Sequence, residues 1–118
     1  MTDTGDQIAA LPLRRKKNGK LEVLLITSRD TGRWVLPKGW RMKGKSPWRA
    51  AEIEALEEAG VTGRIAKPEI GSYRYDKQLD DGQCIPCEVL VYPMLVRRLK
   101  RNWKERAERE RHWFSPKR

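Results

Sequence analysis

The sequence contains few of the residues that most often bind transition metals or form cross-links. Its 118 residues include two cysteines and one histidine. The cysteines stand in Cys84-Ile85-Pro86-Cys87, which is half of a zinc site, and no second pair or nearby histidine completes it. A redox role favours such a motif at a helix start, whereas here it opens an apolar strand. We therefore expect core or surface thiols at both cysteines and a neutral strand residue at His112.

Long apolar runs are also absent. No stretch approaches the roughly 20 apolar residues that are needed to span a bilayer. Residues 1–6 contain neither the basic region nor the apolar run of a signal peptide. The chain has no internal repeat and no low-complexity linker. We expect a flexible N-terminal tail over residues 1–6, a single domain over residues 7–118 and a cytoplasmic location.

Acidic residues are scarce beside basic ones, with 16 Asp and Glu against 26 Lys and Arg, so that the net charge is +10. This balance suits a polyanionic partner, such as a nucleic acid, a nucleotide with several phosphates or a phosphorylated small molecule. Against that basic background, four of the acidic residues fall between positions 52 and 58. The concentration of carboxylates makes this segment the first candidate for a chemical role.

The acidic segment is predicted to be a helix with clear start and stop signals. Ser46 can cap its N-terminus, and Pro47 suits the first helical position. Gly60 fits just past the helix end. The segment that leads into this helix reads as a short strand over residues 34–36, a turn at Pro37-Lys38-Gly39 and a polar loop.

Three carboxylates of this helix are expected on one face. At about 100° per residue, Glu54, Glu57 and Glu58 share an arc, whereas Glu52 points away from it. Such neighbours repel each other, and a cation would remove the penalty. An all-oxygen ligand set suits Mg²⁺ or Mn²⁺ rather than zinc. The alternative is an ordinary solvated acidic face.

Residues 39–61 resemble the Nudix box, G-x5-E-x7-R-E-U-x-E-E-x-G-U, in which U is a bulky aliphatic residue. With the pattern laid on Gly39, five later positions match: Glu54, Glu57, Glu58, Gly60 and Val61. Three positions depart from it. Lys45 replaces the first Glu, Ile53 replaces the Arg, and Ala55 is small for U. The resemblance is therefore specific at the metal-binding half of the box.

Sequence on both sides of the box resembles the diphosphoinositol polyphosphate phosphohydrolase branch of the Nudix superfamily. The similar segments are residues 24–29, 33–37, 102–104 and 109–114, so the resemblance covers nearly all of residues 8–114. It implies an α/β (α+β) fold, an α/β/α sandwich with a mixed β-sheet. Such domains usually place a second helix after the last strand, but this chain stops at Ser115-Pro116-Lys117-Arg118. We expect that C-terminal helix to be missing or truncated, leaving one sheet face less covered.

Around the box, the sequence predicts a β-rich domain. Strands are expected over residues 8–15, 21–28, 34–36, 85–97 and 111–114, with one or two more within residues 64–75. Turns are expected at residues 16–20 and 79–82, and a short helix or irregular loop at residues 102–109. Pro93, inside the longest strand, indicates an edge position or a bulge.

The resemblance implies roles for the helix carboxylates. Glu54, Glu58 and a backbone carbonyl near Lys38 and Gly39 would hold the Mg²⁺ or Mn²⁺ ion. Glu57 occupies the helix position of the general base in the resembled branch.

Phosphate binding is expected on the basic side of the site. Four residues match phosphate contacts of the resembled branch: Thr27, Ser28, Arg29 and Arg109. Apart from the resemblance, the sequence predicts a basic loop before the helix that could also bind phosphate, formed by Lys38, Arg41, Lys43 and Lys45. Simple solvation is the alternative for each of these basic side chains.

The function predicted from these features is metal-dependent hydrolysis of a phosphoanhydride bond in a dinucleoside polyphosphate or a diphosphoinositol polyphosphate. A Nudix-like domain that binds such ligands without turnover is one alternative, favoured by Lys45 and Ile53. An RNA binder or RNA 5′-end pyrophosphohydrolase is another, favoured by charge and by five tryptophans. Three of these, Trp34, Trp48 and Trp113, take positions typical of core packing. The sequence leaves the substrate, the number of metals and the oligomeric state open.

Overall fold

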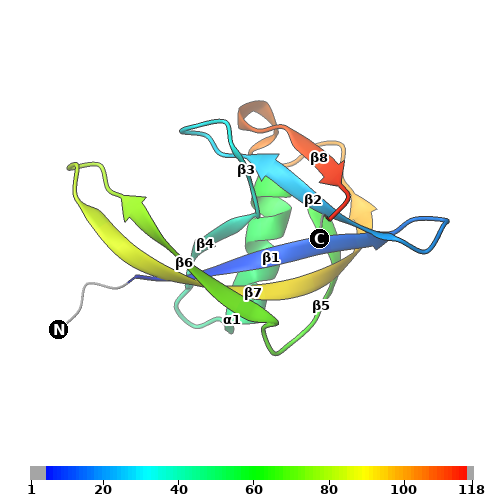
Figure 1. The fold of residues 1–118 in the computed structure, drawn as a ribbon, viewed down its shortest axis with the longest axis horizontal. Coiled ribbons are helices and arrows are strands. Elements are labelled where there is room, and N and C mark those ends of the chain that lie inside the picture. The colour runs from blue at the N-terminus through cyan, green and yellow to red at the C-terminus, as the bar shows by residue number, and fades with distance from the viewer. Residues whose placement is uncertain (1–4, 117–118) are drawn as a thin grey trace.

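A computed structural model describes residues 5–116, which form one mixed β-sheet and a helical segment packed against it (Figure 1). The elements are β1 (Gly5–Arg15), β2 (Leu21–Thr27), β3 (Trp34–Val35), β4 (Lys38–Trp40), α1 (Pro47–Glu54), the π-helix η1 (Ala55–Ala59), β5 (Val61–Ile65), β6 (Gly71–Gln78), β7 (Cys84–Leu99), the 3-10 helix η2 (Arg106–Glu108) and β8 (Arg111–Phe114). The predicted N-terminal tail is too long, because Gly5 and Asp6 already pair with β7. Residues 1–4 lie outside the described part of the chain.

The sheet has eight strands, with the order β3-β2-β1-β7-β5 along its main path. Strand β4 pairs with β1, β6 with β7, and β8 with β2. The β1–β7 pair is parallel, and the other pairs are antiparallel. The predicted mixed sheet and α/β fold class are confirmed. The sequence analysis missed β4, which it treated as turn and loop.

Pro93 lies neither on an edge strand nor in a bulge, so that prediction is wrong. Strand β7 has β1 on one side, and β6 and β5 on the other. Strand β6 pairs with residues 84–91 and β5 with residues 94–99, which leaves Pro93 in the gap between them. In that gap, the Ala66 amide donates to the Pro93 carbonyl at 2.8 Å. The missing N–H of Pro93 therefore faces the interruption and removes no ladder hydrogen bond.

The predicted helix is present, but its second half is not α-helical. The Ser46 hydroxyl accepts the Arg49 amide at 3.3 Å, and Pro47 starts α1, as predicted. From Ala55 the backbone continues as a π-helix, and the Gly60 amide reaches back to the carbonyls of Ala55 and Leu56. Gly60 ends the segment with φ +68°. The assumption of 100° per residue therefore fails after Glu54, because a π-turn holds more residues than an α-turn.

Small residues let the helical segment lie close to the sheet. Its alanines at positions 50, 51, 55 and 59 are fully buried. They share one core with large side chains from β1, β2, β5 and β7: Ile8, Leu24, Ile26, Val61, Tyr92 and Met94. Figure 1 shows α1 behind β1 and β7. Among residues 5–116, no helix follows β8, and none is long and apolar enough to cross a membrane.

The aromatic residues divide between core and surface. Trp48 and Trp113 pack against the core, as predicted. Trp34 does not, because it is 41% exposed and contacts the ring of Phe114 at the sheet edge. His112 lies on β8, the predicted late strand. Cys84 is an exposed free thiol and Cys87 a buried one, as expected.

Candidate active site

A cavity of about 390 Å³ opens beside the junction of α1 and η1. Elements α1 and η1, β4, and the segments after β2 and β7 all contribute to its wall. The wall combines carboxylates with cations: Asp30, Glu54, Glu57, Glu58 and Glu105, with Arg29, Lys38, Lys77 and Arg109. Folding thus brings the three predicted glutamates together with basic residues from distant parts of the chain.

Glu54, which is half-buried, and Glu58, which is buried, form a carboxylate pair. The Lys38 amide donates to Glu58 Oε1 at 3.1 Å, which ties η1 to β4. Burial, together with the nearby Glu58 carboxylate, raises the pKa of Glu54 to about 8. Burial also raises the pKa of Glu58, while the Arg109 guanidinium and the Lys38 amide oppose that rise. The pair therefore keeps a proton at neutral pH.

Gly39 lies against this pair. A Cβ added at Gly39 would collide with the Glu54 carboxylate, so only glycine permits the approach. Two carboxylates beside a backbone segment are the donor types that Mg²⁺ and Mn²⁺ prefer. Within residues 5–116, however, no group of three or more His, Cys, Asp or Glu side chains is arranged to hold a metal ion. The donors fit a divalent cation in kind, while Arg109 Nη2 lies 3.5 Å from Glu58 Oε2.

Glu57 is set apart from the pair. Its Oε1 lies 3.7 Å from Lys104 Nζ, and its side chain is 36% exposed. It still lines the same cavity. The structure therefore gives Glu57 a more open position than Glu54 or Glu58, within reach of water.

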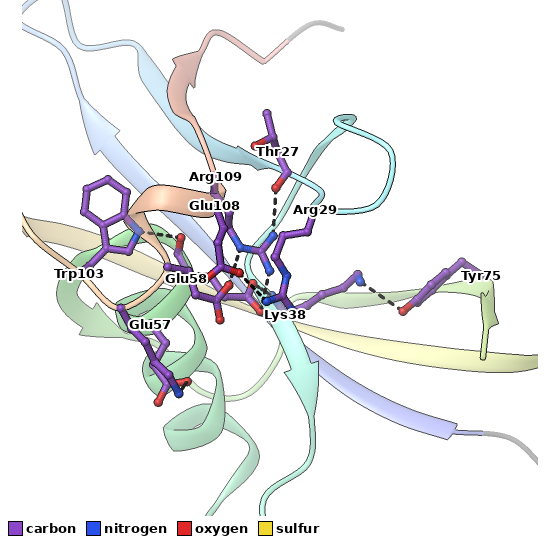
Figure 2. A network of polar contacts seen from close by, with 11 residues as sticks. Thr27, Arg29, Lys38, Glu57, Glu58, Tyr75, Trp103, Glu108 and Arg109 are labelled. Carbon is purple, nitrogen blue, oxygen red and sulfur yellow. Dashed lines mark hydrogen bonds and ion pairs between the residues drawn. The ribbon is translucent and has the colours of Figure 1, made fainter. Parts of the chain in front are cut away.

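Arg109 has its donors turned to the protein. It is largely buried; its Nε donates to Glu105 Oε1 at 2.6 Å and its Nη1 to the Thr27 carbonyl at 3.0 Å. Figure 2 shows its guanidinium beside Glu58. In this arrangement, Arg109 neutralises carboxylates. It also lines the cavity, and it was predicted to contact phosphate. The sequence analysis missed Glu105, although its i,i+4 spacing from Arg109 is a recognisable pairing signal.

The other predicted phosphate contacts divide into two groups. Ser28, Arg29 and Lys38 line the cavity, and Arg29 Nη1 pairs with Glu108 Oε1 at 2.8 Å. Thr27 and Arg41 are absent from the lining. The Thr27 hydroxyl accepts the Glu110 amide at 2.9 Å, so its role here is to hold the segment that carries Arg109.

Two of the residues that depart from the box, Lys45 and Ile53, lie away from the cavity. Lys45 is exposed in the loop before α1, as is Lys43 of the predicted basic loop, and neither lines the cavity. Ile53 lines a separate small pocket with Leu56 and Val61.

Lys38 connects the carboxylate pair to β6. Its Nζ donates to the Tyr75 hydroxyl at 3.2 Å (Figure 2). That hydroxyl donates to Gln7 Oε1 at 2.6 Å. Burial lowers the pKa of Lys38. Lys77, two residues along β6, also lines the cavity. The sequence analysis missed both β6 residues, since no local signal places this strand beside the site.

The segment after β7 supports the π-helix. Trp103 Nε1 donates to the Glu58 carbonyl at 3.0 Å, the Glu105 amide to the Glu57 carbonyl at 3.1 Å, and Arg111 Nη1 to the Ala59 carbonyl at 2.8 Å. These carbonyls end a helix and would otherwise lack partners. The three contacts fix the backbone that carries Glu57 and Glu58.

Comparison with known proteins places the chain among relatives of one kind. The sequence model for the NUDIX domain matches residues 4–118. Nudix hydrolase 21, chloroplastic, from Arabidopsis thaliana is 34% identical over 92% of this chain and 54% of its own length. Diphosphoinositol polyphosphate phosphohydrolase 3-beta from Bos taurus is 30% identical over 79% of this chain and 54% of its own length. The chain thus spans about half the length of these curated relatives.

Solved structures show the same fold. The crystal structure of the C. elegans Ap4A hydrolase superposes with a TM-score of 0.62, at 22% identity, over 98% of this chain and 81% of that chain. At this identity, the likeness shows a shared fold and no more.

Proposed function

The chain belongs to the NUDIX domain family, and on that basis we propose that it hydrolyses a phosphoanhydride bond in a small polyphosphorylated substrate with the help of Mg²⁺ or Mn²⁺. Relatives named as Nudix hydrolases, and one named as a diphosphoinositol polyphosphate phosphohydrolase, support the reaction class. The proposed substrate is either a dinucleoside polyphosphate or a diphosphoinositol polyphosphate.

One observation carries the proposal: a single cavity holds the carboxylates of α1 and η1 and the cations of four other segments. Glu54 and Glu58 form a pair that keeps a proton, because burial and the neighbouring negative charge both disfavour two ionised carboxylates. A divalent cation would displace that proton and stabilise both carboxylates. Arg29, Lys38 and Lys77 offer positive charge on the same wall, where a phosphate chain needs neutralisation.

The metal would be held by Glu54, Glu58 and backbone oxygen near Gly39, and would supply charge neutralisation and a water of lowered pKa. The chain's own residues do the rest. Glu57, the open carboxylate of the cavity, accepts the proton of the attacking water. Glu58 is held in place by the Lys38 amide and by Arg109.

Positioning of the phosphates falls to the basic residues. Arg29, which pairs with Glu108, and Lys77 place positive charge at the cavity, and Ser28 adds a hydroxyl. Lys38 is anchored by Tyr75, so its ammonium group offers a fixed positive charge. Phosphoryl transfer depends on such positioning and charge stabilisation more than on covalent chemistry.

The test is phosphate release from diadenosine tetraphosphate and from a diphosphoinositol polyphosphate, with Mg²⁺, with Mn²⁺ and with chelator. Glu57→Gln removes the proposed base and is expected to lower kcat by roughly 100-fold or more. Glu52→Gln is the matched control, because Glu52 lies on the same helix, pairs with Arg49 and does not line the cavity. It should retain wild-type activity.

Metal-dependent turnover that Glu57→Gln abolishes and Glu52→Gln preserves would support the hydrolase and its base. Turnover unaffected by chelator, or equal losses in the two variants, would contradict the proposal.

The second candidate is a Nudix-like domain that binds such ligands without turnover. The observation that favours it is the contact between Arg109 and Glu58, which sets a cation of the protein beside the carboxylate pair. Calorimetry with a non-hydrolysed analogue separates the two: tight metal-dependent binding without phosphate release would favour this candidate.

A further inference from the structure

A hollow of about 570 Å³ lies on the sheet and shares no lining residue with the candidate active site. Strands β1, β2, β5 and β7 and the segment after β5 form its wall. We call it the apolar hollow, after the wall residues Leu13, Leu21, Ile65, Pro93 and Leu95. Its location and composition set it apart from the polar cavity that was assigned to the reaction.

Strand pairing places a row of apolar residues across the sheet at this hollow. Leu95 of β7 is paired with Leu13 of β1, and Leu13 is paired with Val23 of β2. Val23 in turn is paired with Phe114 of β8. Paired residues of adjacent strands point to the same face of a sheet. Met94, next to Leu95, belongs to the core beneath the helical segment, so the apolar row lies on the opposite face.

This opposite face is partly open to solvent. Leu95 is 53% exposed and Leu21 is 39% exposed. The helical segment packs on the core side of the sheet, where Figure 1 shows α1 behind β1 and β7, so it does not cover these leucines. A single exposed leucine is ordinary on a protein surface, whereas neighbouring apolar residues around a hollow form a patch that a partner can bury.

The charged residues in the wall of the hollow are all basic. Arg64 of β5 is paired with Leu95, and Arg15 of β1 is paired with Leu21, so both arginines share the face of the leucines. Arg15 Nη1 donates to the Gly19 carbonyl at 2.9 Å, which orients the guanidinium without neutralising it. Within residues 5–116, neither arginine forms an ion pair with a carboxylate. The hollow is therefore complementary to a ligand that combines apolar groups with negative charge.

The combination of recess, aliphatic wall and positive charge favours one kind of occupant. A second copy of the chain would bring the same arginines and a net charge of +10, and like charges repel. Single-stranded RNA binds by stacking on aromatic rings, and no aromatic residue lines the hollow. A flat bilayer surface would leave the recess without contacts. A helix with leucines between carboxylates would fill the recess and neutralise the arginines, and helices commonly cover the faces of mixed sheets.

We propose that the apolar hollow is a docking site for an acidic amphipathic helix of a partner protein. Leu21 and Leu95 contact the apolar side chains of that helix, and Arg15 and Arg64 pair with its carboxylates. The surface is separate from the candidate active site, so the docking site does not depend on the proposed function.

The probe is a fluorescently labelled synthetic helix of about 18 residues, with leucines along one face and glutamates beside them. Two control peptides are matched to it: the lysine peptide replaces every glutamate with lysine, and the serine peptide replaces every leucine with serine. Fluorescence anisotropy at constant salt measures the dissociation constant of each peptide. The leucine–glutamate peptide should bind at least roughly tenfold more tightly than either control, because both kinds of contact are needed.

Variants of the protein locate the binding. Leu95→Ser removes an apolar contact and Arg64→Glu reverses a charge, and each should weaken binding of the leucine–glutamate peptide roughly tenfold. Arg64→Glu should also strengthen binding of the lysine peptide, a gain that a folding defect would not produce. The matched controls are Ile70→Ser, at an isoleucine that is 61% exposed, and Arg101→Glu, at an exposed arginine. Both control residues lie outside the hollow, so these variants should leave both affinities nearly unchanged.

Several results would overturn the docking site. These are equal losses in the hollow variants and their controls, a serine peptide that binds as tightly as the leucine–glutamate peptide, and no binding of the latter below about 1 mM. Binding to phosphatidylserine vesicles that Leu95→Ser abolishes would assign the surface to lipid instead. Self-association in sedimentation equilibrium that Leu95→Ser abolishes would assign it to a second copy of the chain.

Discussion

Glu58 contacts more segments of the chain than Glu54 or Glu57 does. Its side chain accepts the Lys38 amide and lies beside Arg109 and Glu54, while its backbone carbonyl accepts Trp103 Nε1. Residues from β4, α1 and the segment after β7 therefore meet at one side chain. The consequence at the scale of single residues is that the Glu54–Glu58 pair keeps a proton when no divalent cation balances it.

That proton predicts how stability depends on pH. Glu54 has a folded-state pKa of about 8, above its ordinary value of 4.5, so the folded chain binds more protons than the unfolded chain between these values. The free energy of unfolding of the metal-free protein should therefore fall as pH rises through this window. Glu54→Gln, which stays neutral, removes this contribution. Urea unfolding of both proteins across the window checks the prediction, and parallel curves would refute it.

Gly39 offers a second prediction at this scale. Gly39→Ala would push the Glu54 carboxylate aside, and we expect Mn²⁺ affinity to fall roughly tenfold. Because the displaced atoms end a flexible side chain, the free energy of unfolding should change by less than about 1 kcal/mol. Gly71→Ala is the control, since nothing lies within 4 Å of the added Cβ. Calorimetric metal titrations of both variants test this, and equal affinities would count against the assigned ligands.

At the scale of elements, the π-helix and the segment after β7 depend on each other. The carbonyls of Glu57, Glu58 and Ala59 accept hydrogen bonds from groups within residues 103–111. The Arg111 guanidinium also lies 4.0 Å from the centre of the Trp103 ring, so these two side chains form one support. A change that separates this segment from η1 should therefore move the carboxylates of Glu57 and Glu58.

A substitution at Gly60, between η1 and β5, tests the support that Trp103 and Arg111 give to η1. Gly60→Ala puts a Cβ in the left-handed region, at φ +68°, and within 2.6 Å of Trp103. The backbone strain costs about 1–2 kcal/mol and the crowding adds about 1–3 kcal/mol. Gly82→Ala is matched, with φ +87° and open space around the added Cβ, so it should lose only the first amount. Urea unfolding measures the difference, and equal losses would show that Trp103 adapts without cost.

At the scale of the whole molecule, the net charge of +10 attracts polyanions to a cavity that itself holds carboxylates. The excess of positive charge outside the carboxylate pair should steer a phosphorylated substrate toward the site. The same charge is the basis of the RNA alternative, so salt dependence separates the two.

For a small substrate, raising the salt concentration from about 50 to 200 mM should raise KM severalfold and leave kcat nearly constant. The reason is that salt screens the long-range attraction between the basic protein and the free substrate. RNA binding through several phosphates would weaken far more steeply, with a slope of roughly −0.7 per phosphate contact on a double-logarithmic plot. Steady-state kinetics with diadenosine tetraphosphate, beside titrations of a single-stranded RNA, check both expectations. RNA affinity in the nanomolar range with a steep slope would favour the RNA alternative.

Much of the site could be predicted because its signals are local. Ser46, Pro47 and Gly60 mark the helix within a few residues of its ends, and the spacing of Glu54, Glu57 and Glu58 is a property of one segment. The hairpin of β1 and β2 follows from the turn at residues 16–20, where the Lys16 amide donates to the Lys20 carbonyl.

Other parts could not be predicted, because they depend on contacts between segments far apart in the chain. The gap that accommodates Pro93 exists only because β6 ends its pairing before β5 begins. Trp34 of β3 and Tyr73 of β6 line one cavity, and no local sequence pattern predicts that these two strands lie close together.

By itself, the sequence determined which carboxylates share the helix and where the helix starts and ends, while the mixed sheet was implied by the resemblance to the Nudix superfamily. Only the tertiary structure decided that the helix continues as a π-turn, that Arg109 turns toward Glu58 and that Thr27 and Arg41 stay outside the cavity. The physical reason is range: capping and side-chain spacing act over a few residues, whereas Trp103 stabilises the Glu58 carbonyl from 45 residues away.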